Sequence, residues 1–237
     1  MFGIKIPARK GNRDEGEKPF WISFSDLMTA LMVLFLVALT VALLAITHEI
    51  SEAEKNKVRR DEEIADLLQK ISAVTENFPG VVVRGHSIDF GDRARYETSQ
   101  HKLTKEQASL LRALVPRILE IARDPLGQKW LKRVIVEGFA DQRGTYLSNL
   151  NLSLQRSQRV MCVLLAAPQQ VSDALGEADR LLVRELFLVG GSSFNSLKET
   201  MDESRRIELK LEFLDIGETR PISQELPLDS DPTCPLD

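Results

Sequence analysis

The sequence predicts a membrane protein of three parts: a single transmembrane helix, a helical stalk, and an α+β domain with helices on one side of a mixed sheet. From Leu27 to Thr47 the chain carries no charged residue, and about 20 apolar residues suffice to cross a hydrocarbon core of about 30 Å. Segment 48–79 is charged at first and then apolar at helical spacing. Beyond residue 80, strand and helix patterns alternate, which is typical of a layered domain.

The predicted transmembrane helix covers residues 20–47. Its apolar run exceeds the roughly 7–15 residues of a signal-peptide core and leads to no convincing cleavage site, which favours an uncleaved anchor. The first basic residue after the run is Lys55. Five basic residues precede it: Lys5, Arg9, Lys10, Arg13 and Lys18. This asymmetry predicts a single-pass membrane protein, with the N-terminus (1–19) on the cytoplasmic side and the C-terminal domain on the opposite side.

Asp26 lies inside the predicted span. A charge exposed to lipid costs a few kcal/mol, so such a carboxylate is expected to be neutral, paired or facing water. Its helix face is small and weakly polar, as contact with other helices requires; this face holds Ser23, Thr29, Ala30, Val33, Val37 and Thr40. The pattern favours an ion-carrier site. An interfacial Asp that reaches the headgroups is the alternative, although Phe20 and Trp21 place the interface a turn before it.

The predicted stalk, 48–79, ends at Pro79-Gly80, a strong helix breaker. Its apolar positions have helical spacing: Ile64, Leu67, Leu68, Ile71, Val74 and Phe78. The outer domain is predicted over 80–216 in the order βαβαββ, and residues 217–237, rich in Pro and acidic residues, are predicted to be disordered. We expect strands at 80–90, at 132–138, within 181–190 and at 207–213, and helices at 103–122 and 148–166, the first capped by Thr104 with Gln107 in a capping box.

Composition narrows the function. The chain has net charge −4 and no Lys/Arg-rich run, which argues against nucleic acid as a partner. His48, His86 and His101 lack metal-ligand spacing, so we predict neither a metal site nor a cofactor. Cys162 is expected to be a small buried apolar residue and Cys234 an unrelated tail thiol, although two cysteines outside a bacterial membrane can pair.

Two charged residues flank a predicted strand–helix turn. Asp141 follows the strand at 132–138, and Arg156 lies two turns into the next helix, so an acceptor and a donor are expected near one another. Such a pair fits a zwitterionic ligand, with an ammonium at Asp141 and a carboxylate held by the guanidinium. Asn149, near the helix start, can add amide contacts. On spacing alone, a salt bridge that joins the turn to the helix is the favoured alternative.

The membrane segment resembles the single membrane helix of the MotB family of stator subunits. The resemblance rests on FWISFSDLMTALMVLFLVAL, which has an aromatic lead-in with Trp21, then Asp26, followed by Met28, Thr29, Ala30 and Met32 at the spacing of that family. It implies that Asp26 carries the translocated ion with Trp21, Ser25 and Thr29 as neighbours. A lone carboxylate with few hydroxyl neighbours favours a proton over sodium. The resemblance also implies a multi-span MotA-like partner, with five partner copies around a homodimer of this chain.

The outer domain resembles OmpA-like peptidoglycan-binding domains. The match begins in VEGFADQRGTYLSNLNLSLQRSQ, and Arg205 and Arg206 match the closing strand. The matching residues are Gly138, Phe139, Asp141, Gly144, Asn149, Leu152, Ser153 and Arg156. The resemblance implies that Asp141 and Arg156 bind the diaminopimelate of the stem peptide. Ala140 and Ser157 depart from the usual Thr and Ala, and Arg143 is additional.

Within the stator class, the chain resembles the stator-like subunit of the Zorya anti-phage defence system more than flagellar subunits. Those tend to have Ala before the Asp, where this chain has Ser25, and a Trp-rich end to the helix, which this chain lacks. We therefore predict a wall-anchored, ion-conducting stator subunit in defence. The alternatives are a flagellar stator subunit and a membrane-tethered wall anchor without ion transport. Asp141 and Arg156 provide no nucleophile–base pair, so no enzyme is predicted.

Overall fold

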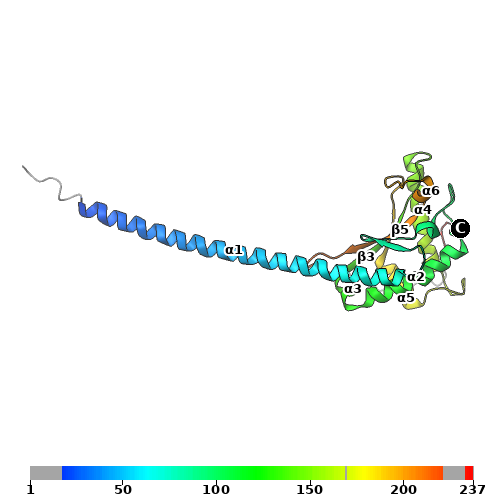
Figure 1. Ribbon diagram of the computed structural model, residues 1–237, viewed down its shortest axis with the longest axis horizontal. Coiled ribbons are helices and arrows are strands. Elements are labelled where there is room, and N and C mark those ends of the chain that lie inside the picture. Colours follow the sequence, from blue (N-terminus) through cyan, green and yellow to red (C-terminus); the bar gives the residue numbers. More distant parts are fainter. Residues whose placement is uncertain (1–17, 169, 221–232, 237) are drawn as a thin grey trace, which may run out of the picture. The chain divides into compact units, whose positions relative to one another are not determined.

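The protein is described here from a computed structural model, which covers residues 18–168, 170–220 and 233–236. The chain divides into two units, Met1–Lys57 and Val58–Asp237. Helix α1 (Lys18–Thr75) contributes to both, and Figure 1 shows it in blue and cyan. The predicted N-terminal segment 1–19 lies almost entirely outside the described residues.

The first unit, as far as it is described, is the N-terminal part of α1. Every side chain from Trp21 to Lys57 is exposed, although most of those up to Ile46 are apolar. A helix that is apolar on all sides and buries nothing in its own chain needs lipid or other helices around it. Within the described residues, one helix is long and apolar enough to cross a membrane, and the predicted span 20–47 lies inside it.

The second unit includes the C-terminal part of α1. Ile64, Leu67 and Ile71 are buried in the core of this unit. The indole Nε1 of Trp130 donates a hydrogen bond of 2.6 Å to Glu63, and Arg60 Nε donates one of 2.8 Å to the Leu214 carbonyl. The outer domain is predicted from residue 80, whereas the compact unit of the structure begins at Val58. The apolar stripe assigned to a stalk packs into the core of this unit instead.

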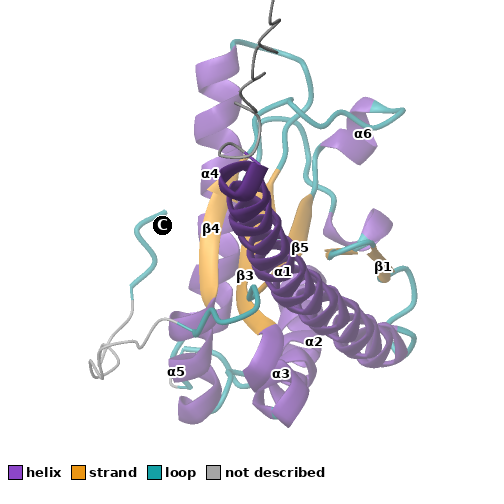
Figure 2. Ribbon diagram, turned by 90° about the vertical axis from the view of Figure 1, so that its left-hand side faces the viewer, coloured by secondary structure: helices purple, strands orange, loops and turns teal. Residues whose placement is uncertain are grey.

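The sheet has five strands in the order β1-β2-β5-β3-β4. Only β3 and β4 pair in parallel; the other neighbours are antiparallel. Figure 2 shows β3, β4 and β5 side by side. The strands are β1 (Val82–Arg84), β2 (Ser87–Asp89), β3 (Leu131–Gly138), β4 (Phe187–Gly191) and β5 (Ile207–Phe213).

Helices cover one face of this mixed sheet, as the sequence predicted. Helix α4 (Tyr146–Leu165) lies along β3 and β4, and α2 (Lys105–Arg123) packs beside α4 (Figure 2). Alternation sets the faces: Ile207, Leu209 and Leu211 are buried, while charged side chains on the same strand point to the other face. The predicted Thr104–Gln107 capping box of α2 is confirmed. The remaining helices are α3 (Pro125–Trp130), α5 (Glu177–Leu186), α6 (Met201–Ser204) and a 3₁₀ turn, η1 (Gly91–Ala94).

Two elements differ from the sequence prediction. Segment 80–90, expected to be one strand, is the hairpin β1–β2, and Gly85 at its turn has a φ of +58°, which suits glycine. The apolar run 181–190 begins as helix α5 and becomes strand β4 at Phe187. A short apolar run does not distinguish a buried helix from a strand, so the helix was missed.

The C-terminal segment is attached to the domain where it is described. Arg220 donates to the carbonyls of Gly127 and Leu131 at 3.0 and 2.8 Å. Cys234 forms a disulfide with Cys162, so the expectation of two unrelated thiols is wrong. The predicted disorder of 217–237 does not hold for 217–220 and 233–236; the rest of that segment, 221–232 and 237, lies outside the described residues.

Candidate functional site

The candidate wall-binding site is built where β3 ends and α4 begins. Gly138 is the last residue of β3, and a Cβ added there would lie 2.0 Å from the Ser153 carbonyl oxygen. Only glycine therefore lets α4 approach the strand this closely. Thr145 caps α4 by accepting a hydrogen bond from the Ser148 amide. The connecting turn contains Asp141, and it places this carboxylate beside the helix.

Asp141 is 5% exposed, and four hydrogen bonds reach its carboxylate. Arg143 supplies three of them, through its backbone N at 3.0 Å, Nε at 3.1 Å and Nη2 at 2.6 Å. The fourth comes from Arg205 Nη1 at 3.1 Å. Burial raises the Asp141 pKa, but the hydrogen bonds from Arg143 and Arg205 outweigh burial and lower the pKa to about 2. The site therefore holds a stable anion.

Arg156 is fully buried on α4, with 0% exposure. Its guanidinium donates to three backbone carbonyls: Phe139 at 2.6 Å, Gln100 at 2.9 Å and Glu97 at 3.4 Å. It also lies over the Tyr96 ring at 4.7 Å. Burial lowers the Arg156 pKa to about 10. Arg156 thus joins loop 97–100 to the end of β3, and within the described part of the chain it forms no hydrogen bond with Asp141.

The other predicted site residues surround this pair. The Asn149 side-chain amide donates to the Arg143 carbonyl at 2.8 Å and so holds the Asp141 turn. Ser153 Oγ accepts a hydrogen bond from the Ser193 amide at 3.1 Å. Leu152, the residue before Ser153 on α4, is half-buried. All three shape the turn and the helix. In the described structure, none of them contacts Asp141 through a hydrogen bond.

Arg205 belongs to the site through direct contact with Asp141. Its Nε donates to the Tyr96 carbonyl at 2.7 Å, and its Nη2 pairs with Asp202. The contribution of Asp202 and of loop 97–100 was missed by the sequence analysis, because backbone carbonyls and a tertiary ion pair leave no motif. Arg143 was noted there as an additional residue, and its position two residues after Asp141 was the available signal.

The charge state of Asp141 makes its stability contribution depend on pH. We expect Asp141→Asn to lower the unfolding free energy at pH 7 by about 1–3 kcal/mol, since charged hydrogen bonds are lost. The carboxylate pKa is depressed from an ordinary value of about 3.9 to about 2. Its stabilisation is therefore present above about pH 4 and is lost as the pH falls toward 2.

Urea unfolding of the full-length protein in detergent, at several pH values, measures this effect. Asp66→Asn, which changes an exposed carboxylate of α1, is the matched control and should stay within about 0.5 kcal/mol of wild type. A difference between wild type and Asp141→Asn that is the same at pH 7 and pH 3 would contradict the assignment.

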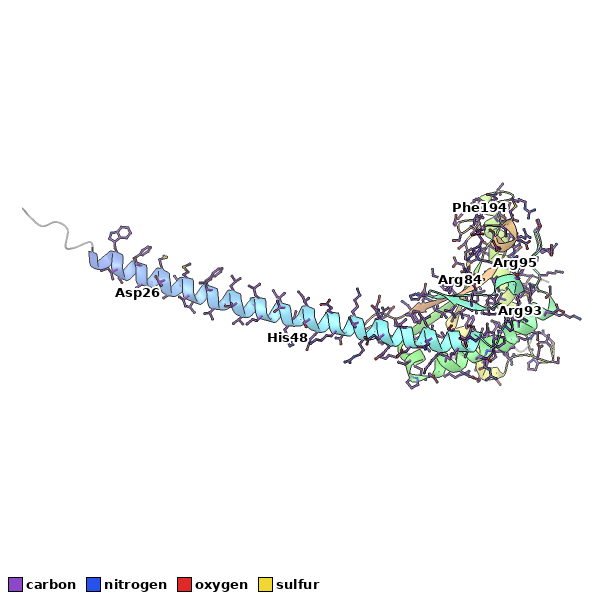
Figure 3. The ribbon with its side chains drawn as sticks, in the orientation of Figure 1. Asp26, His48, Arg84, Arg93, Arg95 and Phe194 are labelled. Atoms are coloured by element: carbon purple, nitrogen blue, oxygen red, sulfur yellow. A yellow bond between two sulfur atoms is a disulfide. The ribbon has the colours of Figure 1, made fainter. Side chains whose placement is uncertain are left out.

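A mixed-charge cavity of about 330 Å³ lies next to this site. Figure 3 shows Arg84 and Arg95, which line it, on the same side of the second unit. Arg95 pairs with Asp202, which in turn pairs with Arg205. The cavity is thus connected through ion pairs to the Asp141 carboxylate.

The second candidate site is on the first unit, at Asp26 of α1 (Figure 3). Thr29 Oγ1 donates to the Ser25 carbonyl at 2.7 Å, which leaves the hydroxyl oxygen available as an acceptor. Trp21 lies five residues before Asp26, about 140° around the helix, and its ring contacts Phe24 instead. Within one chain, Thr29 is thus closer to the Asp26 face than Trp21 or Ser25.

Both the membrane segment and the outer domain are similar in sequence to known proteins. Residues 5–46 match the family described as membrane MotB of the proton-channel complex MotA/MotB. Over 229 residues the chain is 39% identical to the Zorya protein ZorB of Escherichia coli O139:H28 (strain E24377A / ETEC), which covers 95% of this chain and 93% of that protein. The similarity therefore includes the membrane segment and the outer domain.

Two solved structures are similar to the outer domain. The OmpA-like domain of FopA1 from Francisella tularensis subsp. tularensis SCHU S4 matches with 16% identity and a TM-score of 0.36, over 57% of this chain and 82% of that one. The periplasmic domain of Helicobacter pylori MotB matches with 11% identity and a TM-score of 0.37, over 56% and 77%.

Proposed function

Because the chain belongs to the family of the Zorya protein ZorB, we propose that it is the wall-anchored, ion-conducting stator subunit of a MotA/MotB-like rotary motor in an anti-phage defence system. The proposal assigns one role to each unit. The first unit carries the ion across the inner membrane, and the second holds the subunit to peptidoglycan in the periplasm. It describes a structural motor subunit and not an enzyme.

The observation that carries the proposal is the presence of an intramembrane carboxylate and a wall-site carboxylate in one chain. Asp26 is the only acidic residue in the predicted span 20–47. A single helix cannot enclose an ion path, so a multi-span MotA-like partner must complete it. We propose a ring of five partners around two copies of this chain. Asp26 takes up a proton from the periplasmic side and releases it to the cytoplasm, while the ring rotates around the anchored pair.

The ion is proposed to be a proton. Sodium needs several oxygen ligands, and near Asp26 its helix face offers only the hydroxyls of Ser23 and Thr29 from this chain. A carboxyl group needs no such cage to bind and release a proton. Oxygen atoms from the partner subunits would be required for sodium.

The wall ligand is proposed to be the diaminopimelate of the stem peptide. Its ammonium pairs with Asp141, the anion at the end of β3. The complete burial of Arg156 favours a positioning role, in which it holds loop 97–100, over the direct carboxylate contact that the resemblance implies. Gly138, Asn149, Leu152, Ser153 and Arg205 then shape the turn and hold the carboxylate in place.

Purification from the native operon tests the proposal. A stator subunit should leave the membrane in a large complex with a multi-span partner, whereas a plain anchor should purify alone. The same preparation should sediment with isolated sacculi. A locus that encodes flagellar genes, and no nuclease or helicase partner, would favour the flagellar alternative instead.

A further inference from the structure

We propose that the Arg143 side chain occupies the position on Asp141 that the ammonium of the wall peptide takes on binding, so that the anchor binds by exchanging one cation for another. This inference rests on the wall-anchor function proposed above. In this inference Arg143 competes with the ligand for Asp141, whereas the residues that match the peptidoglycan-binding signature shape or hold the site.

Four donors surround the Asp141 carboxylate, and three of them share one oxygen. Oδ2 accepts from Arg143 Nε, Arg143 Nη2 and Arg205 Nη1, and Oδ1 accepts from the Arg143 backbone. Each carboxylate oxygen offers about two lone-pair sites, so Oδ2 is fully occupied, and the Asp141 side chain is 6% exposed. A ligand ammonium that reaches Oδ2 must therefore displace one of its donors.

The two arginines differ in how firmly they are held. The Arg205 side chain is 9% exposed and also bonds the Tyr96 carbonyl and Asp202. The Arg143 side chain is 49% exposed, and among the described residues its other hydrogen bond goes to the hydroxyl of Thr98, at 3.0 Å. Arg143 can move into water without leaving a buried donor unpaired, whereas Arg205 cannot. The exchangeable cation is thus Arg143.

The exchange of Arg143 for a ligand cation on Asp141 also sets which ligands the site can accept. Asp141 and Arg205 stay paired when the ammonium replaces the Arg143 guanidinium, so the buried charges remain balanced. A ligand without a cation has nothing to offer Asp141 and leaves Arg143 in place. The arrangement therefore selects for a free amine, which the stem-peptide diaminopimelate supplies in uncross-linked positions.

Sacculus sedimentation with the full-length protein in detergent tests this role. We expect Arg143→Ala and Arg143→Gln to bind diaminopimelate-containing sacculi roughly two- to fivefold more tightly, because a half-exposed ion pair no longer competes. Soluble meso-diaminopimelate should displace both variants at correspondingly lower concentrations. Thermal unfolding confirms that each variant is folded, and the Gln variant retains most of the side-chain length.

Arg117→Ala is the matched control, because its side chain on α2 is 60% exposed and lies outside both the Asp141 cluster and the cavity beside it. Removing that positive charge should not tighten binding to the anionic wall. Unchanged or weaker binding of both Arg143 variants would overturn the exchange role. Failure of the proposed function is a different result: wild type itself would then not sediment with sacculi, or Asp141→Asn would bind as well as wild type.

Discussion

Asp26→Asn is expected to abolish phage protection and ion flow, while the protein remains in the membrane and bound to the wall. Asn has the size of Asp but cannot take up and release a proton near neutral pH. Every cycle of the proposed motor needs that step, so no partial activity is expected. The measurement is the plating efficiency of phage on cells carrying the native operon with Asp26→Asn, which should rise to the efficiency on cells without the operon.

Two controls make this result interpretable. Membrane levels and sacculus binding of Asp26→Asn should equal those of wild type, because the substitution is distant in sequence from the wall site. Asp66→Asn, on the part of α1 that belongs to the outer unit, should protect as wild type does. Protection that persists in Asp26→Asn would show that the protein is an anchor with an interfacial Asp. If wild type fails to protect, the defence assignment falls and motility is the next assay.

Arg156→Ala is expected to abolish sacculus binding and to lower the unfolding free energy by about 2–4 kcal/mol. The substitution leaves the buried carbonyl of Phe139 without its Arg156 donor, a loss that costs about 1–3 kcal/mol, and it also removes the donor to the part-buried carbonyl of Gln100. Loop 97–100 would also lose its attachment to α4. Arg156→Lys should recover little, because an ammonium cannot donate in three fixed directions as the guanidinium fork does.

Equilibrium unfolding and sacculus sedimentation of the same preparations separate the two effects. Arg117→Ala on α2 is the control, since that side chain is 60% exposed and should change stability by no more than about 0.5 kcal/mol. A folded Arg156→Lys protein that binds sacculi like wild type would contradict the positioning role.

Much of the fold could be predicted because its signals are local. Strand β5 alternates buried and charged residues without interruption, and α2 begins with a complete capping box. The prediction failed where the deciding contacts are distant in sequence. Ile64, Leu67 and Ile71 have the spacing of any amphipathic helix, and only the folded domain shows that it is their partner.

The candidate site was predicted to the same extent. The sequence placed Asp141 and Arg156 at the C-terminal end of a strand, and in the structure both lie near the end of β3, where Arg156 bonds the Phe139 carbonyl. It did not show that Arg156 gives its hydrogens to backbone carbonyls, because carbonyls are common to all residues. It also did not show that Arg143 and Arg205 both donate to the Asp141 carboxylate. That contact forms only because the segment between α6 and β5, which contains Arg205, folds back next to the end of β3.

The Cys162–Cys234 bridge makes export of the outer unit visible on a gel. Thiols stay reduced in the bacterial cytoplasm and pair in the periplasm, and the two cysteines are 72 residues apart with β4 and β5 between them. A chain that keeps free thiols has therefore not delivered this segment across the membrane, whereas a closed bridge marks completed translocation. Alkylation of intact cells followed by non-reducing electrophoresis reads the orientation of the membrane helix directly, without any assay of the motor.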